Sequence, residues 1–327
     1  MTRFFLLLHA TMTAALLLGG ALHAAAAETR VRVNVFVGPQ NLALYVAQEK
    51  GLFTKHGLAV EIQITPNSRA QRDGLKDGSF DIAQSAVDNA VALVEVEKAD
   101  VIVVAGGSDG MNELIVRQEI NSYGDIRGRA VVVDRPDTAY ALILYKMLAL
   151  QGLHKGDYSV IPAGACPQRR AALQPDRGGV ANLMNPPCSL MVRNEGFRSF
   201  ARATDVIGPY QADGLWVMRA WAQANADTLI RYLRASIEAY RWGSDPANRA
   251  EAADIVAKYL KVDRDIAARS VEAAVGPRGG VAKDARIDME GFRNTLRLRA
   301  EMAGGDRNAS PDRYIDLSYY ERALAGF

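Results

Sequence analysis

The chain has 327 residues, of which 49% are hydrophobic and 23% are charged, and its formal net charge is +2. A chain of this length suits one large or two modest domains, each with a core of its own. Its 39 basic and 37 acidic side chains nearly balance, which gives no support to nucleic-acid binding or to a polybasic membrane contact, because either would need clustered positive charge.

The first 27 residues have the pattern of a secretory signal peptide. Arg3 precedes an apolar stretch from Phe4 to Leu18, and a run of small residues follows up to position 27. A transmembrane anchor is the alternative, but His9 and the Gly19–Gly20 pair interrupt the apolar run. We therefore expect cleavage before Glu28, a net charge of +1 after cleavage, and a soluble protein exported to the periplasm.

Strands and helices alternate from position 31 to position 105. VRVNVFV at 31–37 has the two-residue period of a strand, and a helix follows that should end near Gly51, where a positive φ is favourable. Further strands are predicted at 59–65, 80–83 and 100–105, with apolar-faced helices between them. This order is typical of an α/β unit in which a mostly parallel sheet is flanked by helices.

A second unit of the same kind is predicted after position 116. Strands are expected at 129–134, 158–162 and 179–185, with helices between them. Segments 204–209 and 215–220 also look extended, and we interpret the second as a return crossing that precedes helices up to Phe327. The predicted organisation is a signal peptide at 1–27, a first lobe beginning at 28–115, a second lobe at 116–214, and a return to the first lobe at 215–327.

Short polar residues follow several of the predicted strands, where the crevice of an α/β fold lies. Gln40 and Asn41 begin the first helix, and Gln84 and Ser85 precede a later one, where free backbone N–H groups favour an accepting group on a ligand. The second unit has polar residues at the same kind of place: Asp137, Thr138 and Asn185. Helix capping is the alternative role for Ser85, Asp137 and Thr138, and Asn185 before two prolines could simply shape a turn.

Recognisable catalytic motifs are scarce. The chain has no HExxH, GxSxG or P-loop pattern, and His56 and His154 both stand where helices are expected to end. We therefore expect no enzyme, no catalytic residue, no metal site and no cofactor. The two cysteines, Cys166 and Cys188, are candidates for a disulfide because the protein is expected to be exported, and free buried cysteines are the alternative.

Three stretches together resemble a known family: ALYVAQEKGLFTKHGLAVEIQ at 43–63, GLKDGSFDIAQSAVDNAVAL at 74–93 and INSYGDIRGRAVVV at 120–133. They are similar to the periplasmic solute-binding proteins of ABC importers in the nitrate/sulfonate/bicarbonate and thiamine-precursor class. The resemblance covers essentially the whole chain after position 27. It implies a type II periplasmic-binding fold, in which two α/β lobes joined by two crossing strands close over one ligand.

The resemblance places the ligand loops of that family on ten residues of this chain: Gln40, Asn41, Gln84, Ser85, Ser108, Asp109, Asp137, Thr138, Asn185 and Tyr210. Cations are few near these positions, with Arg135 and Arg169 the nearest. For stacking on a heteroaromatic ligand, only Phe36, Tyr210 and Trp216 are expected to be placed suitably.

The implied function is that of the substrate-binding subunit of an ABC importer. It would capture a small polar organic solute, a sulfonate, carboxylate or pyrimidine-like compound, by lobe closure about a hinge near Arg117 and Leu215, and would deliver it to an inner-membrane permease with its ATPase. We expect a monomer with no nucleic-acid partner. The alternatives are an exported ligand-binding sensor and an enzyme like the thiamine-pyrimidine synthase of the same superfamily, whose cysteine-rich motif and pocket histidine are lacking here.

Overall fold

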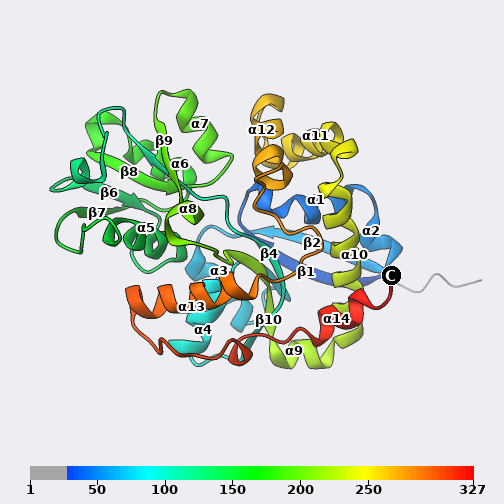
Figure 1. The fold of residues 1–327 in the computed structure, drawn as a ribbon. Coiled ribbons are helices and arrows are strands. Elements are labelled where there is room, and N and C mark those ends of the chain that lie inside the picture. Colours follow the sequence, from blue (N-terminus) through cyan, green and yellow to red (C-terminus); the bar gives the residue numbers. More distant parts are fainter. Residues whose placement is uncertain (1–27) are drawn as a thin grey trace, which may run out of the picture.

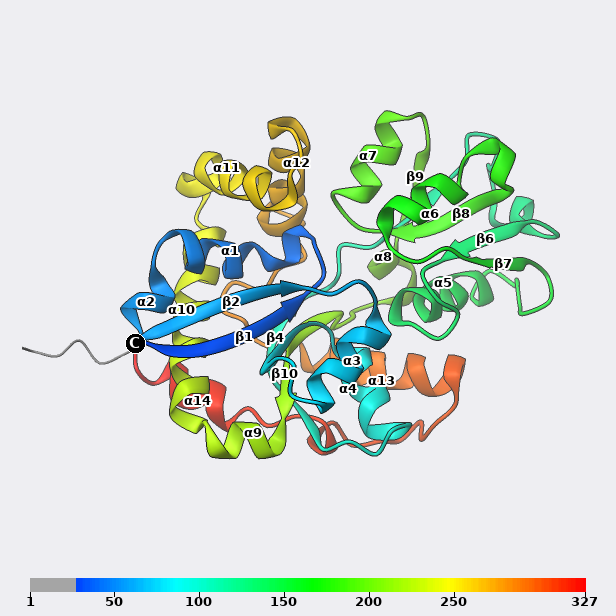
Figure 2. The same ribbon diagram turned by 180° about the vertical axis from the view of Figure 1, so that it is seen from behind.

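The computed structural model describes residues 28–327, so the predicted signal peptide lies outside the described residues. The described chain forms two lobes, each with its own sheet and its own helices, and they lie next to each other in Figure 1. Figure 2 shows the same two lobes from behind. The predicted α/β class with two lobes is confirmed.

The first lobe contains a five-stranded sheet with the order β2-β1-β3-β10-β4. Its strands are β1 (Thr29–Val35), β2 (Leu58–Ile64), β3 (Ile82–Ala86), β4 (Val101–Ser108) and β10 (Asp213–Met218). β1 pairs with β2 and β3 in parallel, whereas β10 runs antiparallel to both β3 and β4. The sheet is thus mostly parallel with one reversed strand, and β10 begins at the edge where β3 and β4 end.

The second sheet repeats this plan with the order β7-β6-β8-β5-β9. Its strands are β5 (Glu113–Val116), β6 (Ala130–Val133), β7 (Ser159–Pro162), β8 (Gly179–Met184) and β9 (Arg198–Arg202). β5 is the reversed strand and lies between β8 and β9. In each lobe, therefore, the reversed strand starts beside the carboxyl ends of its neighbours.

Helices cover both sheets. The first lobe carries α1 (Leu42–Glu49), α2 (Leu52–Lys55), α3 (Ser68–Lys76), α4 (Val87–Glu95), α9 (Arg219–Ala224), α10 (Ala226–Ser244), α11 (Arg249–Leu260), α12 (Arg264–Val275), α13 (Met289–Ala303) and α14 (Ser318–Leu324). The second carries α5 (Ala139–Ala149), α6 (Cys166–Ala172), α7 (Cys188–Asn194) and α8 (Ala203–Ile207). Single 3-10 turns occur at η1 (Pro39–Asn41), η2 (Tyr123–Ile126), η3 (Pro175–Arg177), η4 (Pro246–Asn248) and η5 (Pro311–Arg313).

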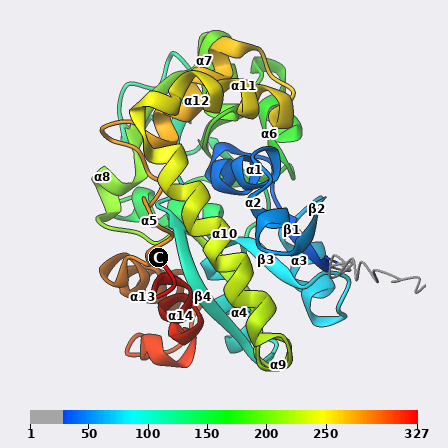
Figure 3. The ribbon, with the colours of Figure 1, turned by 90° about the vertical axis from the view of Figure 1, so that its right-hand side faces the viewer.

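Apolar side chains fill the space on both faces of the first sheet. On one face, α1 and the long helix α10 pack through residues such as Leu42, Tyr232 and Leu233, and Figure 3 shows α10 running along this lobe. On the other face, α4 and α13 surround Trp216. Burial of this apolar area is the main stabilising contribution to the lobe. Gly51 has φ 65°, as predicted for the residue that ends the first helix.

The segment between the second sheet and β10 differs from its predicted form. Residues 204–209 were expected to be extended, but α8 occupies Ala203–Ile207 and packs against α5. The extended strand comes earlier, as β9, whose sequence RSFAR carries two arginines that hide the strand pattern. Segment 215–220 was expected to be the return crossing, but β10 is an inner strand of the first sheet and α9 begins at Arg219.

Two connections therefore join the sheets. Residues 109–112 lead from β4 to β5, and residues 203–212 lead from β9 through α8 to β10. The lobe boundaries at 115/116 and 214/215 stay predictions from the sequence.

The lobes also touch each other through helices. α13 packs on α5, with the Lys146 ammonium 2.7 Å from Glu301, and α12 lies against α7, where Arg269 donates to Asn194 at 3.1 Å.

Candidate functional site

Buried polar side chains gather at the carboxyl ends of the strands of the first sheet. Asp213, the first residue of β10, is in register with Ala86 at the end of β3 and with Ser108 at the end of β4. Gln84 and Ser85 lie near the carboxyl end of β3, and Gln40 and Asn41 lie in η1, shortly after β1. The topology thus brings together the polar residues that the sequence placed in separate loops of this lobe.

Asn41 and Gln84 form one hydrogen-bond chain inside the first lobe. The Asn41 amide donates to the Phe36 carbonyl at 2.6 Å, and the Gln84 amide donates to Asn41 Oδ1 at 3.4 Å. The Tyr232 hydroxyl completes the chain by donating to Gln84 Oε1 at 3.3 Å. These contacts hold η1 and the end of β3 in a fixed geometry.

Gln40 differs from these two residues because its side-chain oxygen is left free. Gln40 Oε1 is buried and has no hydrogen-bond partner among residues 28–327. The side chain folds back over Gly38, where a Cβ would lie 2.1 Å from Gln40 Oε1. Glycine at position 38 therefore makes room for an acceptor that is available to another group.

Ser85 does not cap a helix. The N-cap of α4 is Ala86, and the Ser85 hydroxyl donates to Gln71 Oε1 at 2.5 Å. Gln71 in turn donates to Asn34 Oδ1 at 3.0 Å. The capping alternative is therefore wrong for Ser85, which ties α3 to the first sheet.

Ser108 and Asp109 lie where the chain leaves the first lobe. The Ser108 hydroxyl donates to Asp213 Oδ2 at 2.6 Å and accepts from the Gly110 N–H at 3.0 Å. Asp109 forms an ion pair with Arg202, at the end of β9 in the second sheet, and accepts from the Met111 N–H at 2.8 Å. The Asp109 carboxylate is thus neutralised within the connection between the sheets.

Asp213 is the carboxylate that the strand ends of the first lobe present. It is 6% exposed, and burial raises its pKa to about 6, against the opposing effect of the Ser108 hydroxyl. The same negative charge contributes to the raised pKa of the Tyr140 phenol, whose first cause is burial. Tyr140 lies in α5, so the field of Asp213 acts across the junction between the lobes.

In the second lobe, Thr138 and Asp137 stand at the start of α5. Thr138 occupies the N-cap position without capping through its side chain, because its hydroxyl donates to Asp134 Oδ1 at 2.5 Å. Asp137 is exposed and pairs with Arg135 at 3.3 Å, so both of these charges are already matched on the surface. Capping is therefore the wrong role for Thr138.

Asn185, which follows β8, and Tyr210, which lies in the connection between α8 and β10, are both buried. The Asn185 carbonyl accepts from the Ser189 N–H at 3.0 Å and so helps begin α7. Tyr210 packs in the core of the second lobe, and burial raises the pKa of its phenol. Trp216 is fully buried between β3 and β4. The full burial of Trp216 between its neighbouring strands contradicts its expected placement for stacking on a ligand, whereas the placement of Tyr210 stays a prediction.

Three residues outside the ten predicted ones also belong to the candidate site in the second lobe: Tyr140, Arg169 and Asn182. Arg169, in α6, is 7% exposed and donates through Nη1 to the Leu183 carbonyl at 2.8 Å and to Asn182 Oδ1 at 3.3 Å. Its guanidinium carbon lies 5.7 Å from the centre of the Tyr140 ring, a cation–π geometry. The sequence marked Arg169 only as a nearby cation, and no local motif pointed to Tyr140 or Asn182.

The two cysteines stand at the first positions of α6 and α7. The structure pairs Cys166 with Cys188 in a disulfide, with Cα atoms 6.2 Å apart. A bridge here would join the helix that carries Arg169 to the helix that follows Asn185. It stays a prediction that thiol counting would test.

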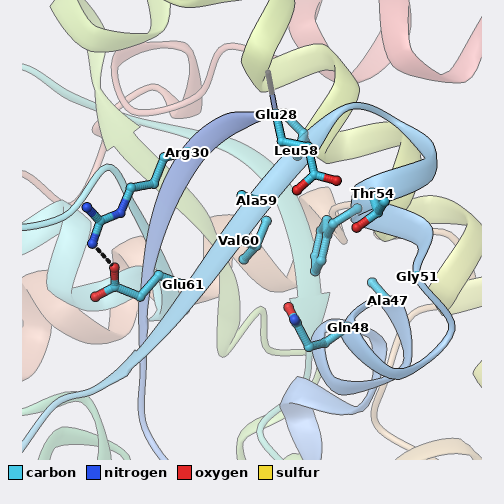
Figure 4. A pocket seen from close by; sticks show the side chains of 11 residues that line it. Glu28, Arg30, Ala47, Gln48, Gly51, Thr54, Leu58, Ala59, Val60 and Glu61 are labelled. Carbon is cyan, nitrogen blue, oxygen red and sulfur yellow. Dashed lines mark hydrogen bonds and ion pairs between the residues drawn. The ribbon is translucent and has the colours of Figure 1, made fainter. Parts of the chain in front are cut away.

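A cavity of about 340 Å³ lies elsewhere on the first lobe (Figure 4). It is bordered by the edge strand β2, the start of β1, and the segment joining α1 to α2, and Arg30 and Glu61 form an ion pair at one side. None of the ten predicted residues lines it. Its walls belong to one lobe, so it does not bring the two sets of strand ends together.

Residues 28–327 offer neither a metal site nor a membrane-spanning helix. This range holds no group of three or more histidine, cysteine or carboxylate side chains arranged to bind a metal. No helix within it has the length and apolar character needed to cross a bilayer.

Comparison with known proteins links this geometry to a family. The family described as NMT1/THI5-like matches residues 38–248. A protein of Brucella abortus strain 2308, provisionally named as a binding protein, is 26% identical over 222 residues, which is 67% of each chain.

Solved structures share the fold at low sequence identity. The ligand-binding component of an ABC-type import system from Staphylococcus aureus, solved with zinc bound, aligns with a TM-score of 0.77 and 16% identity over 90% of this chain and 99% of that one. The periplasmic nitrate-binding protein NrtA from Synechocystis aligns with a TM-score of 0.75 and 14% identity over 92% and 89% of the two chains.

Proposed function

Because this chain belongs to the NMT1/THI5-like family, we propose that it is the exported substrate-binding subunit of an ABC importer. In this role it captures a small polar organic solute between its two lobes and delivers it to an inner-membrane permease with its ATPase. The fold shared with an import component and with a periplasmic nitrate-binding protein supports the proposal.

One observation carries the proposal most directly. Each lobe has buried polar side chains: Gln40 and Asp213 at the strand ends of the first lobe, and Arg169 of α6 against Asn182 of β8 in the second. Buried polar groups are ordinarily satisfied within a protein, yet Gln40 Oε1, Arg169 Nε and Asn182 Nδ2 are among the fifteen buried side-chain atoms of residues 28–327 that have no partner. A bound solute would supply the missing hydrogen bonds.

Closure follows from the way the solute would be shared. A ligand that contacts both lobes binds the closed arrangement more tightly than an open one, and that difference in affinity shifts the population towards closure. Such a hinge would bend in the two connections, residues 109–112 and 203–212. The positions expected from the sequence differ, because Arg117 directly follows β5 in the second lobe and Leu215 lies within β10 of the first. Transfer to the permease needs no chemistry in this subunit.

Binding is tested by native mass spectrometry of the purified protein and by a thermal-shift screen of small sulfonates, carboxylates, amino acids and pyrimidines. We expect at least one solute to raise the melting temperature with a concentration dependence that follows mass action. A protein that carries no small molecule and responds to none of these four classes would contradict the proposed function.

A further inference from the structure

Four charged side chains are buried in the part of the chain that the structure describes: Asp88, Arg169, Asp213 and Arg299. Two of them neutralise each other, because the Arg299 guanidinium lies 2.8 Å from the Asp88 carboxylate between α13 and α4. The other two come from opposite lobes, and neither forms an ion pair with any of residues 28–327. Burying an unpaired charge is costly, so the pattern calls for an explanation.

Arg169 is incompletely satisfied by its own lobe. Its Nη1 group is hydrogen-bonded to neutral oxygens of Leu183 and Asn182, while its buried Nε has no acceptor within residues 28–327. The Asn182 Nδ2 amide beside it is also a buried donor without an acceptor. The second lobe therefore presents a positive charge and two free donors, the complement of a carboxylate or a sulfonate.

Asp213, in the first lobe, lacks a positively charged partner. Its Oδ2 accepts from the neutral Ser108 hydroxyl, and no cation of the described chain lies against it. In the same lobe, Gln40 Oε1 is a buried acceptor without a donor. The first lobe therefore presents a negative charge and a free acceptor, the complement of an ammonium group.

The positions of the Arg169 and Asp213 charges can be compared through their neighbours. The Arg169 guanidinium lies over its ring, and the Asp213 charge, which comes from the other lobe, acts on its phenol. The connection of residues 109–112 runs from Ser108, which is in register with Asp213, to Glu113, which is in register with Met184, next to the Leu183 carbonyl that Arg169 contacts. The two unpaired charges therefore lie at the strand ends that this short connection links.

From this complementarity we infer that the solute is a small zwitterion. Its acidic group binds Arg169 and Asn182 in the second lobe, and its ammonium group binds Asp213 and Gln40 in the first. The inference rests on the proposed function and narrows it, because a compound with only one of the two charges would satisfy only one lobe.

The test is a thermal-shift and calorimetric titration with three matched sets of solutes. The zwitterions are glycine, β-alanine, γ-aminobutyrate and taurine; the anions are acetate, propionate, butyrate and ethanesulfonate; the amines are ethylamine, propylamine and butylamine. We expect at least one zwitterion to bind about tenfold to a hundredfold more tightly than its matched anion and its matched amine, the range for one charged hydrogen-bonded contact. An anion or an amine that binds as tightly as its zwitterion, or a set in which no zwitterion binds, overturns the inference.

Two variants separate the roles of the charges. Asp213→Asn should remove the preference for the zwitterion over the matched anion, whereas Arg169→Gln should weaken both. Retention of the full preference in Asp213→Asn would also overturn the inference. If the wild type binds a pyrimidine but no zwitterion, or binds a simple anion as tightly as its zwitterion, the zwitterion is refuted while the proposed function stays intact. Only a failure to bind in all classes would remove both.

Discussion

Replacing Asp213 by Asn should stabilise the ligand-free protein at neutral pH. The folded protein raises the pKa of this carboxyl from 3.8 to about 6, so the ionised form is disfavoured by folding. For a pKa that is raised on folding, the stabilising contribution is present below pH 4 and is lost as the pH rises through 6. A difference of about two pKa units corresponds to about 3 kcal/mol, which is the upper limit of the gain at pH 7.5.

The assay is urea unfolding of the ligand-free wild type and the Asp213→Asn variant at pH 4.0 and pH 7.5. The Ser108 hydroxyl keeps an acceptor in the variant, because the Asn side-chain oxygen replaces Asp213 Oδ2. We expect the variant to gain about 1 to 3 kcal/mol at pH 7.5 and to lose most of that advantage at pH 4.0. A variant that is less stable than the wild type at pH 7.5, or a difference that is the same at both pH values, would refute the reasoning.

A matched control uses the other buried aspartate. Asp88 is paired with Arg299, so Asp88→Asn breaks a buried ion pair and leaves the guanidinium without its counter-ion. That change should destabilise the protein by about 3 to 5 kcal/mol. If the free energy of unfolding rises in Asp213→Asn and falls in Asp88→Asn, then the buried charge of Asp213, unlike that of Asp88, does not stabilise the fold.

Three further predictions concern Ser85, the cysteines and the N-terminus. Ser85→Ala leaves Gln71 Oε1 without its donor, so urea unfolding should show a loss of about 1 to 3 kcal/mol; an unchanged stability with a large loss of affinity would instead make Ser85 a direct ligand contact. Thiol counting after denaturation of oxidised protein should find no free thiol, and reduction should lower the free energy of unfolding by about 3 kcal/mol; two free thiols would dismiss the bridge between Cys166 and Cys188. N-terminal sequencing of the exported protein should begin at Glu28, and an intact N-terminus would contradict the signal-peptide prediction.

The sequence predicted the architecture because alternating strands and helices leave a strong periodic pattern. The valines of β1 and the apolar run of β4 identify their strands directly. β9 was not predicted because its sequence, RSFAR, carries charges. α8 was not predicted because its five residues are too few to show a helical period. The role of β10 as an inner strand depends on pairing with β3 and β4, which no local pattern encodes.

The candidate site was predictable only in part. Residues such as Gln40 and Gln84 were found because they follow predicted strands, and the edge where parallel strands end is known from topology. Ser108 was indicated only by the family resemblance. Arg169 was harder to place, because its position depends on how α6 packs against β8, which brings its guanidinium to Asn182 and Leu183. Asp213 is noticeable only once β10 is seen to start beside the ends of β3 and β4.

Lobe closure on a solute is the central claim, and small-angle X-ray scattering tests it most directly. The measurement compares the radius of gyration of the ligand-free protein with that of the protein saturated by a solute from the screen. The account predicts a smaller radius with the solute, because contacts to both lobes favour the closed arrangement. An unchanged radius at saturation would contradict it.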